Sequence, residues 1–152
     1  MNSKPDIAVY SADHNLLLVV EIKGTPKSDE SWAAKLRRNL VVHGAVPAAP
    51  YFLLVVPDHL YLWENEISSE AVPPSYSADT RTVLQKYLPK WKNIKHEPVS
   101  ERGLELAVQS WLSELATADD NAPVDEATNA WLRGSGLTEK IRTGEVRAEC
   151  QA

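Results

Sequence analysis

The chain has 152 residues, 43% of them hydrophobic, and a formal net charge of −5. This length fits one compact domain with an adequate core, and no apolar run approaches the roughly twenty residues of a membrane span. The N-terminus lacks a basic segment and an apolar signal region, and the single cysteine excludes an internal disulfide. Because these features fit a reducing compartment, we expect a cytoplasmic protein without a membrane-bound segment.

Two apolar runs rich in β-branched residues open the chain on either side of a polar turn. The runs cover residues 5–10 and 16–23, and Ser11–Asn15 between them carries side chains typical of turns. This order predicts a short antiparallel hairpin.

Charged side chains occupy the open end of the predicted hairpin. Counting back from the turn places Asp6 opposite Val20 or Glu21. Because side chains alternate along a strand, Glu21 and Lys23 point to one face while Ile22 points to the other, into the core. Hard cations such as Mg²⁺ prefer oxygen ligands, and an adjacent ammonium can orient the attacking water. The open end of the hairpin is therefore a candidate metal site.

An amphipathic helix is predicted from Asp29 to His43, and a buried strand follows from Tyr51 to Val56. The predicted packed stripe of the helix consists of Trp32, Leu36, Leu40 and His43. His43 also precedes Gly44, where an imidazole can cap the carbonyls at a helix end. Polar side chains with i, i+3 and i+4 spacing lie close together on the opposite face. These are Lys35, Arg38 and Asn39.

The motif Pro5-Asp6 followed by Glu21-Ile22-Lys23 resembles that of the PD-(D/E)xK nuclease superfamily, the restriction-endonuclease-like phosphodiesterases. The order of strand, turn, strand, helix and strand is similar to the core of that superfamily, and the resemblance covers residues 5–63. More narrowly, the chain resembles small, uncharacterised bacterial members. The resemblance implies an α/β fold, with a central mixed β-sheet flanked by helices.

The resemblance also implies roles for particular residues. Asp6 and Glu21 would bind Mg²⁺ or Mn²⁺, the backbone carbonyl of Ile22 would be a third metal ligand, and Lys23 would position the attacking water. The side chains that would contact the scissile phosphate are Lys35, Arg38 and Asn39. The expected activity is metal-dependent cleavage of phosphodiester bonds, with nucleic acid, DNA above all, as the substrate.

The chain departs from the superfamily before the first strand. Many members have a helix there that supplies another acidic residue, but only five residues precede Asp6. We therefore expect a fold that lacks the usual first helix. Either the site works with fewer ligands, or a partner subunit supplies the missing element, or the domain is catalytically inactive and serves as a protein-interaction or nucleic-acid-binding module.

Acidic residues concentrate towards the end of the chain. Residues 1–57 have a net charge of +1 and residues 58–95 are neutral, whereas residues 96–152 have a net charge of −6. An acidic surface repels a phosphate backbone, so we expect weak, salt-sensitive binding of nucleic acid. The basic stretch 81–95 has two interpretations. Its lysines could follow a phosphate backbone, with Tyr87 and Trp91 stacking on bases, but we favour an amphipathic helix over residues 80–88.

The remainder of the chain is predicted to be mainly helical. Residues 68–78 form a proline-rich loop, and Ser100 is the predicted N-cap of a helix that runs to about Thr117. A shorter helix is expected from Pro123 to Arg133, and a turn and a strand within residues 137–146.

We therefore interpret residues 1–152 as a single domain with three parts. Residues 1–66 form the nuclease-like core, residues 79–134 a mainly helical extension, and residues 135–152 a C-terminal tail. A sheet without its first helix leaves apolar surface uncovered, which favours a homodimer or a protein partner.

Overall fold

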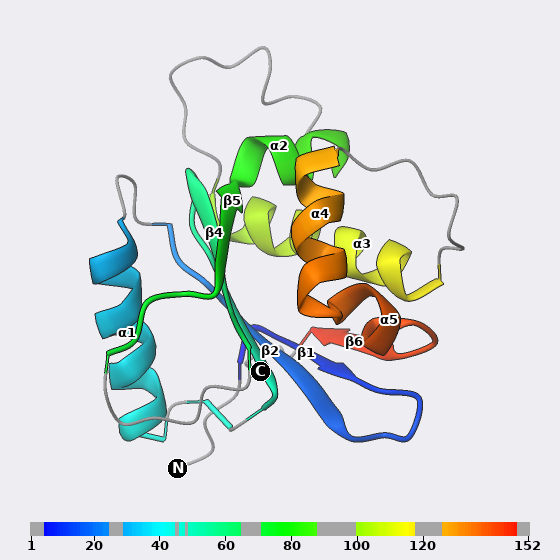
Figure 1. Ribbon diagram of the computed structural model, residues 1–152, viewed down its shortest axis with the longest axis horizontal. Helices are drawn as coiled ribbons and strands as arrows, with labels where there is room; N and C mark the ends of the chain where they lie inside the picture. The colour runs from blue at the N-terminus through cyan, green and yellow to red at the C-terminus, as the bar shows by residue number, and fades with distance from the viewer. Residues whose placement is uncertain are drawn as a thin grey trace.

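The computed structural model describes residues 5–24, 29–44, 46–47, 49–64, 71–87, 100–117 and 126–148, with only the backbone at 126–129 and 131. These residues form a mixed six-stranded sheet with the order β5-β4-β3-β2-β1-β6. Helix α1 covers one face of the sheet, and α3, α4 and α5 lie on the other side (Figure 1). The predicted α/β class, with helices flanking a mixed sheet, is confirmed.

The N-terminal hairpin forms as predicted. Strands β1 (Ile7–Tyr10) and β2 (Leu16–Ile22) are antiparallel, with Ile7 opposite Val20. In the turn, the Ser11 N–H donates to the Asn15 carbonyl at 2.8 Å, and His14 has a positive φ of 66°.

Helix α1 (Glu30–Val42) connects β2 to the parallel strand β3 (Tyr51–Val55). The Asp29 carboxylate caps the helix by accepting from the Trp32 N–H at 2.7 Å. The helix ends at His43, whose N–H donates to the Asn39 and Val41 carbonyls, and Gly44 follows with a φ of 67°.

One expectation for α1 was wrong: His43 does not belong to the packed stripe. Its side chain is exposed, whereas Trp32, Leu36 and Leu40 pack against the sheet. The reason is that His43 is the C-cap residue, beyond the last helical turn, so the 3.6-residue period no longer directs its side chain.

The sheet is extended by β4 (His59–Glu64) and by β5 (Tyr76–Asp79), both in antiparallel pairing. The predicted loop over residues 68–78 is therefore wrong at its end, where β5 begins. Only alternate residues of this edge strand are half-buried, so pairing with β4 decides its structure more than its own polar composition does.

The later helices lie where the sequence pattern predicts them, but the helix expected to end at Arg133 runs to Ser135. After α2 (Thr80–Leu84) and a 3₁₀ turn (Gln85–Tyr87), α3 runs from Glu101 to Thr117. The Ser100 hydroxyl accepts from the Gly103 N–H at 3.0 Å, which confirms the predicted N-cap. The chain continues with α4 (Glu126–Ser135), α5 (Leu137–Ile141) and β6 (Glu145–Ala148).

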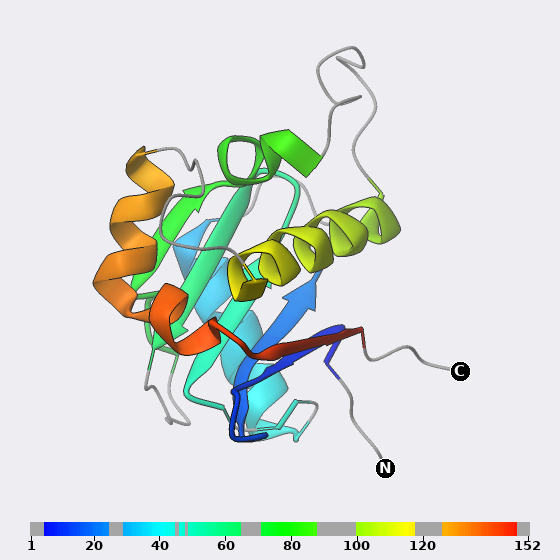
Figure 2. The ribbon, with the colours of Figure 1, turned by 90° about the vertical axis from the view of Figure 1, so that its right-hand side faces the viewer.

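Strand β6 returns to the N-terminal hairpin and pairs antiparallel with β1 (Figure 2). The predicted final turn and strand are thus present as α5 and β6, although β6 extends to Ala148, beyond the predicted end at Val146. Because β6 lies at the outer edge of the sheet, β1 has a hydrogen-bonded neighbour on both sides.

Two apolar clusters hold the layers together, one on each face of the sheet. On the face covered by α3, Leu18, Val20 and Ile22 belong to the same cluster as Leu104 and Val108 of that helix. Ile22 is buried as predicted. No helix among the described residues combines the length and apolar character that a membrane crossing requires.

The face covered by α1 contains an unexpected buried cation. Arg37 is buried, and its guanidinium carbon lies 5.7 Å from the ring centroid of Phe52 and 5.4 Å from that of Trp63. These distances permit cation–π attraction to both rings. The basic side chain that α1 directs towards the sheet is therefore Arg37.

Candidate functional site

The carboxylates of Asp6 and Glu21 are fixed at the open end of the hairpin by reciprocal hydrogen bonds. The Asp6 N–H donates to Glu21 Oε2 at 3.0 Å and to the Val20 carbonyl at 3.1 Å. In return, the Ile22 N–H donates to Asp6 Oδ2 at 2.7 Å. Each carboxylate is thus held by a backbone amide of the other strand, and the predicted register is confirmed.

The two carboxylates lie in an environment that disfavours their charge. Only 7% of Glu21 is exposed, and Asp6 is half-buried. Burial and then the Asp6 charge raise the pKa of Glu21 from an ordinary 4.5 to about 7. Burial also raises the pKa of Asp6, although the hydrogen bond from the Ile22 N–H opposes this shift.

Lys23 is the cation of this group. Its backbone N–H donates to the Val55 carbonyl at 3.0 Å, so β3 holds the end of β2 in place. The Lys23 charge lowers the pKa of both Asp6 and Glu21. The structure therefore brings together the three side chains for which the sequence motif implies catalytic roles.

Helix α3 adds two acidic residues to the same end of the sheet. Glu101 Oε1 accepts from the Gly24 N–H at 2.8 Å, and Glu105 forms an ion pair with Arg102 at 2.5 Å. The charges of Glu105 and Glu101 both raise the pKa of Asp6. Helix α3, late in the chain, therefore brings two acidic side chains near Asp6.

The sequence contains a partial signal for these two acids. Glu101 and Glu105 have i, i+4 spacing, so they share one side of α3, and Glu105 directly follows the core residue Leu104. An acidic pair at the border of an apolar stripe is a recognisable feature. Which end of the sheet it reaches depends on how α3 crosses the strands.

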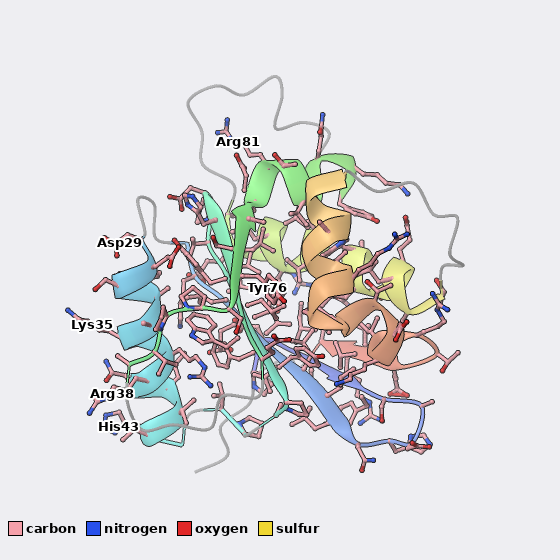
Figure 3. All side chains as sticks on the ribbon, in the orientation of Figure 1. Asp29, Lys35, Arg38, His43, Tyr76 and Arg81 are labelled. Carbon is pink, nitrogen blue, oxygen red and sulfur yellow. The ribbon has the colours of Figure 1, made fainter. Side chains whose placement is uncertain are left out.

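The three predicted phosphate-binding side chains of α1 lie elsewhere. Lys35, Arg38 and Asn39 are exposed, and Arg38 Nη1 donates to Asn39 Oδ1 at 3.4 Å. Figure 3 shows Lys35 and Arg38 pointing from α1 away from the sheet. The structure groups these three with one another and does not bring them to Asp6 and Glu21.

The described part of the basic stretch supports its interpretation as a packed helix. Lys86 Nζ lies 2.6 Å from Glu114 Oε1 of α3, and Tyr87 packs against the core. Burial, followed by the hydrogen bond with Glu114, raises the pKa of Tyr87 to about 12. Trp91 and the other residues of 88–99 lie outside the described ranges.

A separate groove lies at the opposite end of the hairpin. Its volume is about 410 Å³, and its lining includes Ser11, His14, Thr117, Thr143 and Glu145. The turn of the hairpin, the end of α3 and the start of β6 contribute these residues. The groove is thus distinct from the carboxylate pair.

Metal ligation at the open end of the hairpin would depend on the two carboxylates of Asp6 and Glu21. In the described ranges, no three His, Cys, Asp or Glu side chains are grouped so that they could hold one ion. Mg²⁺, however, is often bound by one or two carboxylates together with waters and substrate phosphate. Comparisons of the chain with protein-family models, with curated proteins and with solved structures found no match.

Proposed function

We propose that the protein is a metal-dependent phosphodiesterase of the DNA-endonuclease type, with a restriction-endonuclease-like core. Asp6 and Glu21 hold Mg²⁺ or Mn²⁺, and Lys23 positions the attacking water. The observation that carries this proposal is the pair of reciprocal hydrogen bonds that fixes the two carboxylates as neighbours. Two adjacent, partly desolvated carboxylates repel each other, and a divalent cation would relieve that repulsion.

The donor atoms fit such an ion. One oxygen of each carboxylate accepts a backbone N–H, and the second oxygen takes no part in these two bonds. The proposed third ligand is the backbone carbonyl of Ile22, whose side chain is buried in the core and carries no ligand atom. When bound, the metal supplies Lewis-acid charge and makes a coordinated water more acidic.

Lys23 provides the complementary charge. It lies close enough to lower the pKa of both carboxylates, and an ammonium carries three donors that a water or a phosphate oxygen can accept. In the proposed reaction this side chain orients the water and balances charge on the phosphate. Because the chain carries a net charge of −5, we expect the substrate to bind weakly and with salt sensitivity.

The second candidate function is a catalytically inactive module of the same fold that binds protein or nucleic acid. The observation that favours it is that both carboxylates already have backbone partners, so they can serve as a structural clamp between β1 and β2. In that case the acidic C-terminal part would face protein partners or a second copy of the chain. Analytical ultracentrifugation that finds only monomers would exclude the second copy.

A cleavage assay distinguishes the two candidates. Single-stranded, duplex and branched DNA and RNA are incubated with Mg²⁺ or Mn²⁺, with EDTA as the metal-free control. We expect metal-dependent cleavage by the wild type and its loss in Asp6→Ala and Lys23→Ala. Asp13→Ala, which removes an exposed carboxylate from the hairpin turn, is the matched control. Cleavage that survives both substitutions would rule out this site.

Direct metal binding provides the second readout. Calorimetric titration with Mn²⁺ should show binding to the wild type and to Asp13→Ala, and weaker binding to Glu21→Gln. A correctly folded wild-type protein that neither binds Mn²⁺ nor cleaves any of the substrates would favour the inactive module.

A further inference from the structure

A hydrogen bond between residues 77 positions apart connects the end of β2 to the first turn of α3. The Gly24 N–H donates to Glu101 Oε1 at 2.8 Å. The preceding amide is held as well, since the Lys23 N–H donates to the Val55 carbonyl at 3.0 Å. The two peptide groups that flank the Lys23 Cα are therefore both fixed, one by β3 and the other by α3.

The position of Gly24 is adapted to this contact. A Cβ atom at residue 24 would lie 3.0 Å from Glu101 Cγ, which is closer than ordinary van der Waals contact. The Glu101 side chain therefore lies directly against the backbone of Gly24. Because the nearest atom is Cγ and not a carboxylate oxygen, the stem of the Glu101 side chain would have to shift by a few tenths of an ångström to accept the added atom.

We propose that Glu101 is a positioning residue for Lys23, an inference that rests on the proposed function for its catalytic meaning. Two fixed flanking amides determine the direction in which the Lys23 side chain leaves the backbone. A lysine side chain is long and flexible, so its ammonium can be placed accurately only if the backbone at its Cα is fixed. Small misplacements of a catalytic group are costly, and α3 therefore contributes to the site without touching the substrate.

The contact also has a favourable electrostatic setting. Glu101 lies in the first turn of α3, where a carboxylate is stabilised by the helix dipole. A bond between a carboxylate and a backbone N–H is stronger than a neutral one. An effect of the dipole alone, however, would depend on the charge of residue 101, whereas positioning depends on its acceptor oxygen.

The test compares Glu101→Ala with Glu101→Gln, which removes the charge but keeps an acceptor. Glu30→Ala is the matched control, because Glu30 is the exposed acid in the first turn of α1. The first readout is the hydrogen exchange of the Gly24 amide measured by NMR, and the second is the Lys23 Cε–Hε resonance. We expect about tenfold faster Gly24 exchange and a shifted Lys23 resonance in Glu101→Ala, because one charge-assisted hydrogen bond is lost. Glu30→Ala should resemble the wild type, whereas Glu101→Gln, which keeps a neutral acceptor, should lie closer to the wild type than to Glu101→Ala.

Cleavage kinetics give the third readout. In Glu101→Ala we expect kcat to fall by about tenfold to a hundredfold with KM unchanged, since the loss affects the placement of a catalytic group. Gly24→Ala should have the same effect because it displaces Glu101. The double substitution Gly24→Ala with Glu101→Ala should then cost no more than either single change.

The outcomes separate this inference from the proposed function. An unchanged Lys23 resonance and unchanged Gly24 exchange in Glu101→Ala would overturn the inference, whatever the activity. It would also be overturned if Glu101→Gln behaved like Glu101→Ala, or if the wild type cleaved and Glu101→Ala retained its full kcat. If the wild type does not cleave but the NMR changes occur in Glu101→Ala alone, Lys23 is positioned by Glu101 and only the proposed catalysis fails.

Discussion

The two ends of the N-terminal hairpin differ in what holds them. At the open end, contacts from distant parts of the chain fix Asp6, Glu21 and Lys23, including bonds from β3 and α3. At the turn end, the bonds of Ser11–Asn15 are local, and the groove is lined mainly by small and hydroxyl-bearing side chains. One end concentrates charge in a fixed geometry, and the other leaves an open polar surface.

Backbone strain is found at the turn end. His14 and Thr143 are the non-glycine residues with positive φ in the described ranges, at 66° and 63°. The next residue lies very close to β1, because a Cβ at Gly144 would lie 2.4 Å from the Tyr10 carbonyl oxygen. The chain must pass this close to β1 in order to enter β6. The turn end thus combines backbone strain with a close approach of two chain segments, whereas the open end combines two desolvated carboxylates with cross-strand hydrogen bonds.

The largest expected effect tests which end of the hairpin is responsible for the proposed cleavage. Glu21→Gln keeps an oxygen that can accept from the Asp6 N–H but loses the charge that would bind a metal in the proposed reaction. We expect kcat/KM for metal-dependent cleavage to fall by about a hundredfold or more, as when a key electrostatic group is removed from an active site.

The matched change at the other end is His14→Gly, which relieves a positive φ and should leave kcat/KM unchanged. Circular dichroism would confirm that both variants are folded. If His14→Gly abolished cleavage and Glu21→Gln did not, the chemistry would have to be assigned to the turn end.

Local pattern was sufficient to predict the parts of the site that lie close together in the sequence. The turn residues and the two-residue period of the strands predicted the cross-strand placement of Asp6 and Glu21. A capping residue likewise predicted the start of α3 at Ser100, and the amphipathic pattern predicted the start of α1 at Asp29. In each case the deciding interaction spans a few residues or a single hairpin.

Features that depend on tertiary packing could not be predicted in this way. The contact of Glu101 with Gly24 requires α3 to cross the sheet at one particular end. Helical spacing placed Lys35 and Arg38 opposite the packed stripe, and they do point away from the sheet (Figure 3), but spacing could not show that this face does not meet Asp6 and Glu21. The spacing of residues along a helix or strand determines which side chains share a face. Which part of the protein that face contacts depends on tertiary packing.

The next expected effect concerns the stability of the carboxylate end without metal. The pKa of Glu21 rises from 4.5 to about 7 on folding, so the folded state binds the proton more tightly. Its contribution to stability is therefore complete below pH 4.5 and is lost as the pH rises towards 7. A shift of this size corresponds to at most about 3 kcal/mol in the free energy of unfolding.

Urea unfolding in EDTA between pH 4.5 and 8 measures this loss, with Glu21→Gln as the control. The wild type should lose stability relative to Glu21→Gln over this range, and the raised pKa of Asp6 acts in the same direction. Glu114 and Glu145 have lowered pKa values, so their stabilising contribution is fully present above their unfolded pKa of 4.5. It is lost only as the pH falls below the range of this experiment. Parallel pH profiles of the two proteins would show that Glu21 is not destabilised by burial. Added Mg²⁺ should restore stability at pH 8 in the wild type alone.

The smallest expected effect concerns strain at the turn end. A left-handed conformation costs a non-glycine residue about 1–2 kcal/mol, and a substitution by glycine removes this cost. The greater conformational entropy of glycine in the unfolded chain offsets part of that stabilisation. Thr143→Gly also loses the bond from Thr143 Oγ1 to the Arg142 carbonyl, so we expect a net stabilisation of about 0.5 kcal/mol. The same substitution at Thr138, inside α5, should destabilise by a few tenths of a kcal/mol, because glycine is a poor helix former. Urea unfolding of both variants should therefore give shifts of opposite sign. A destabilised Thr143→Gly would mean that the threonine side chain stabilises the groove by more than its backbone strain costs.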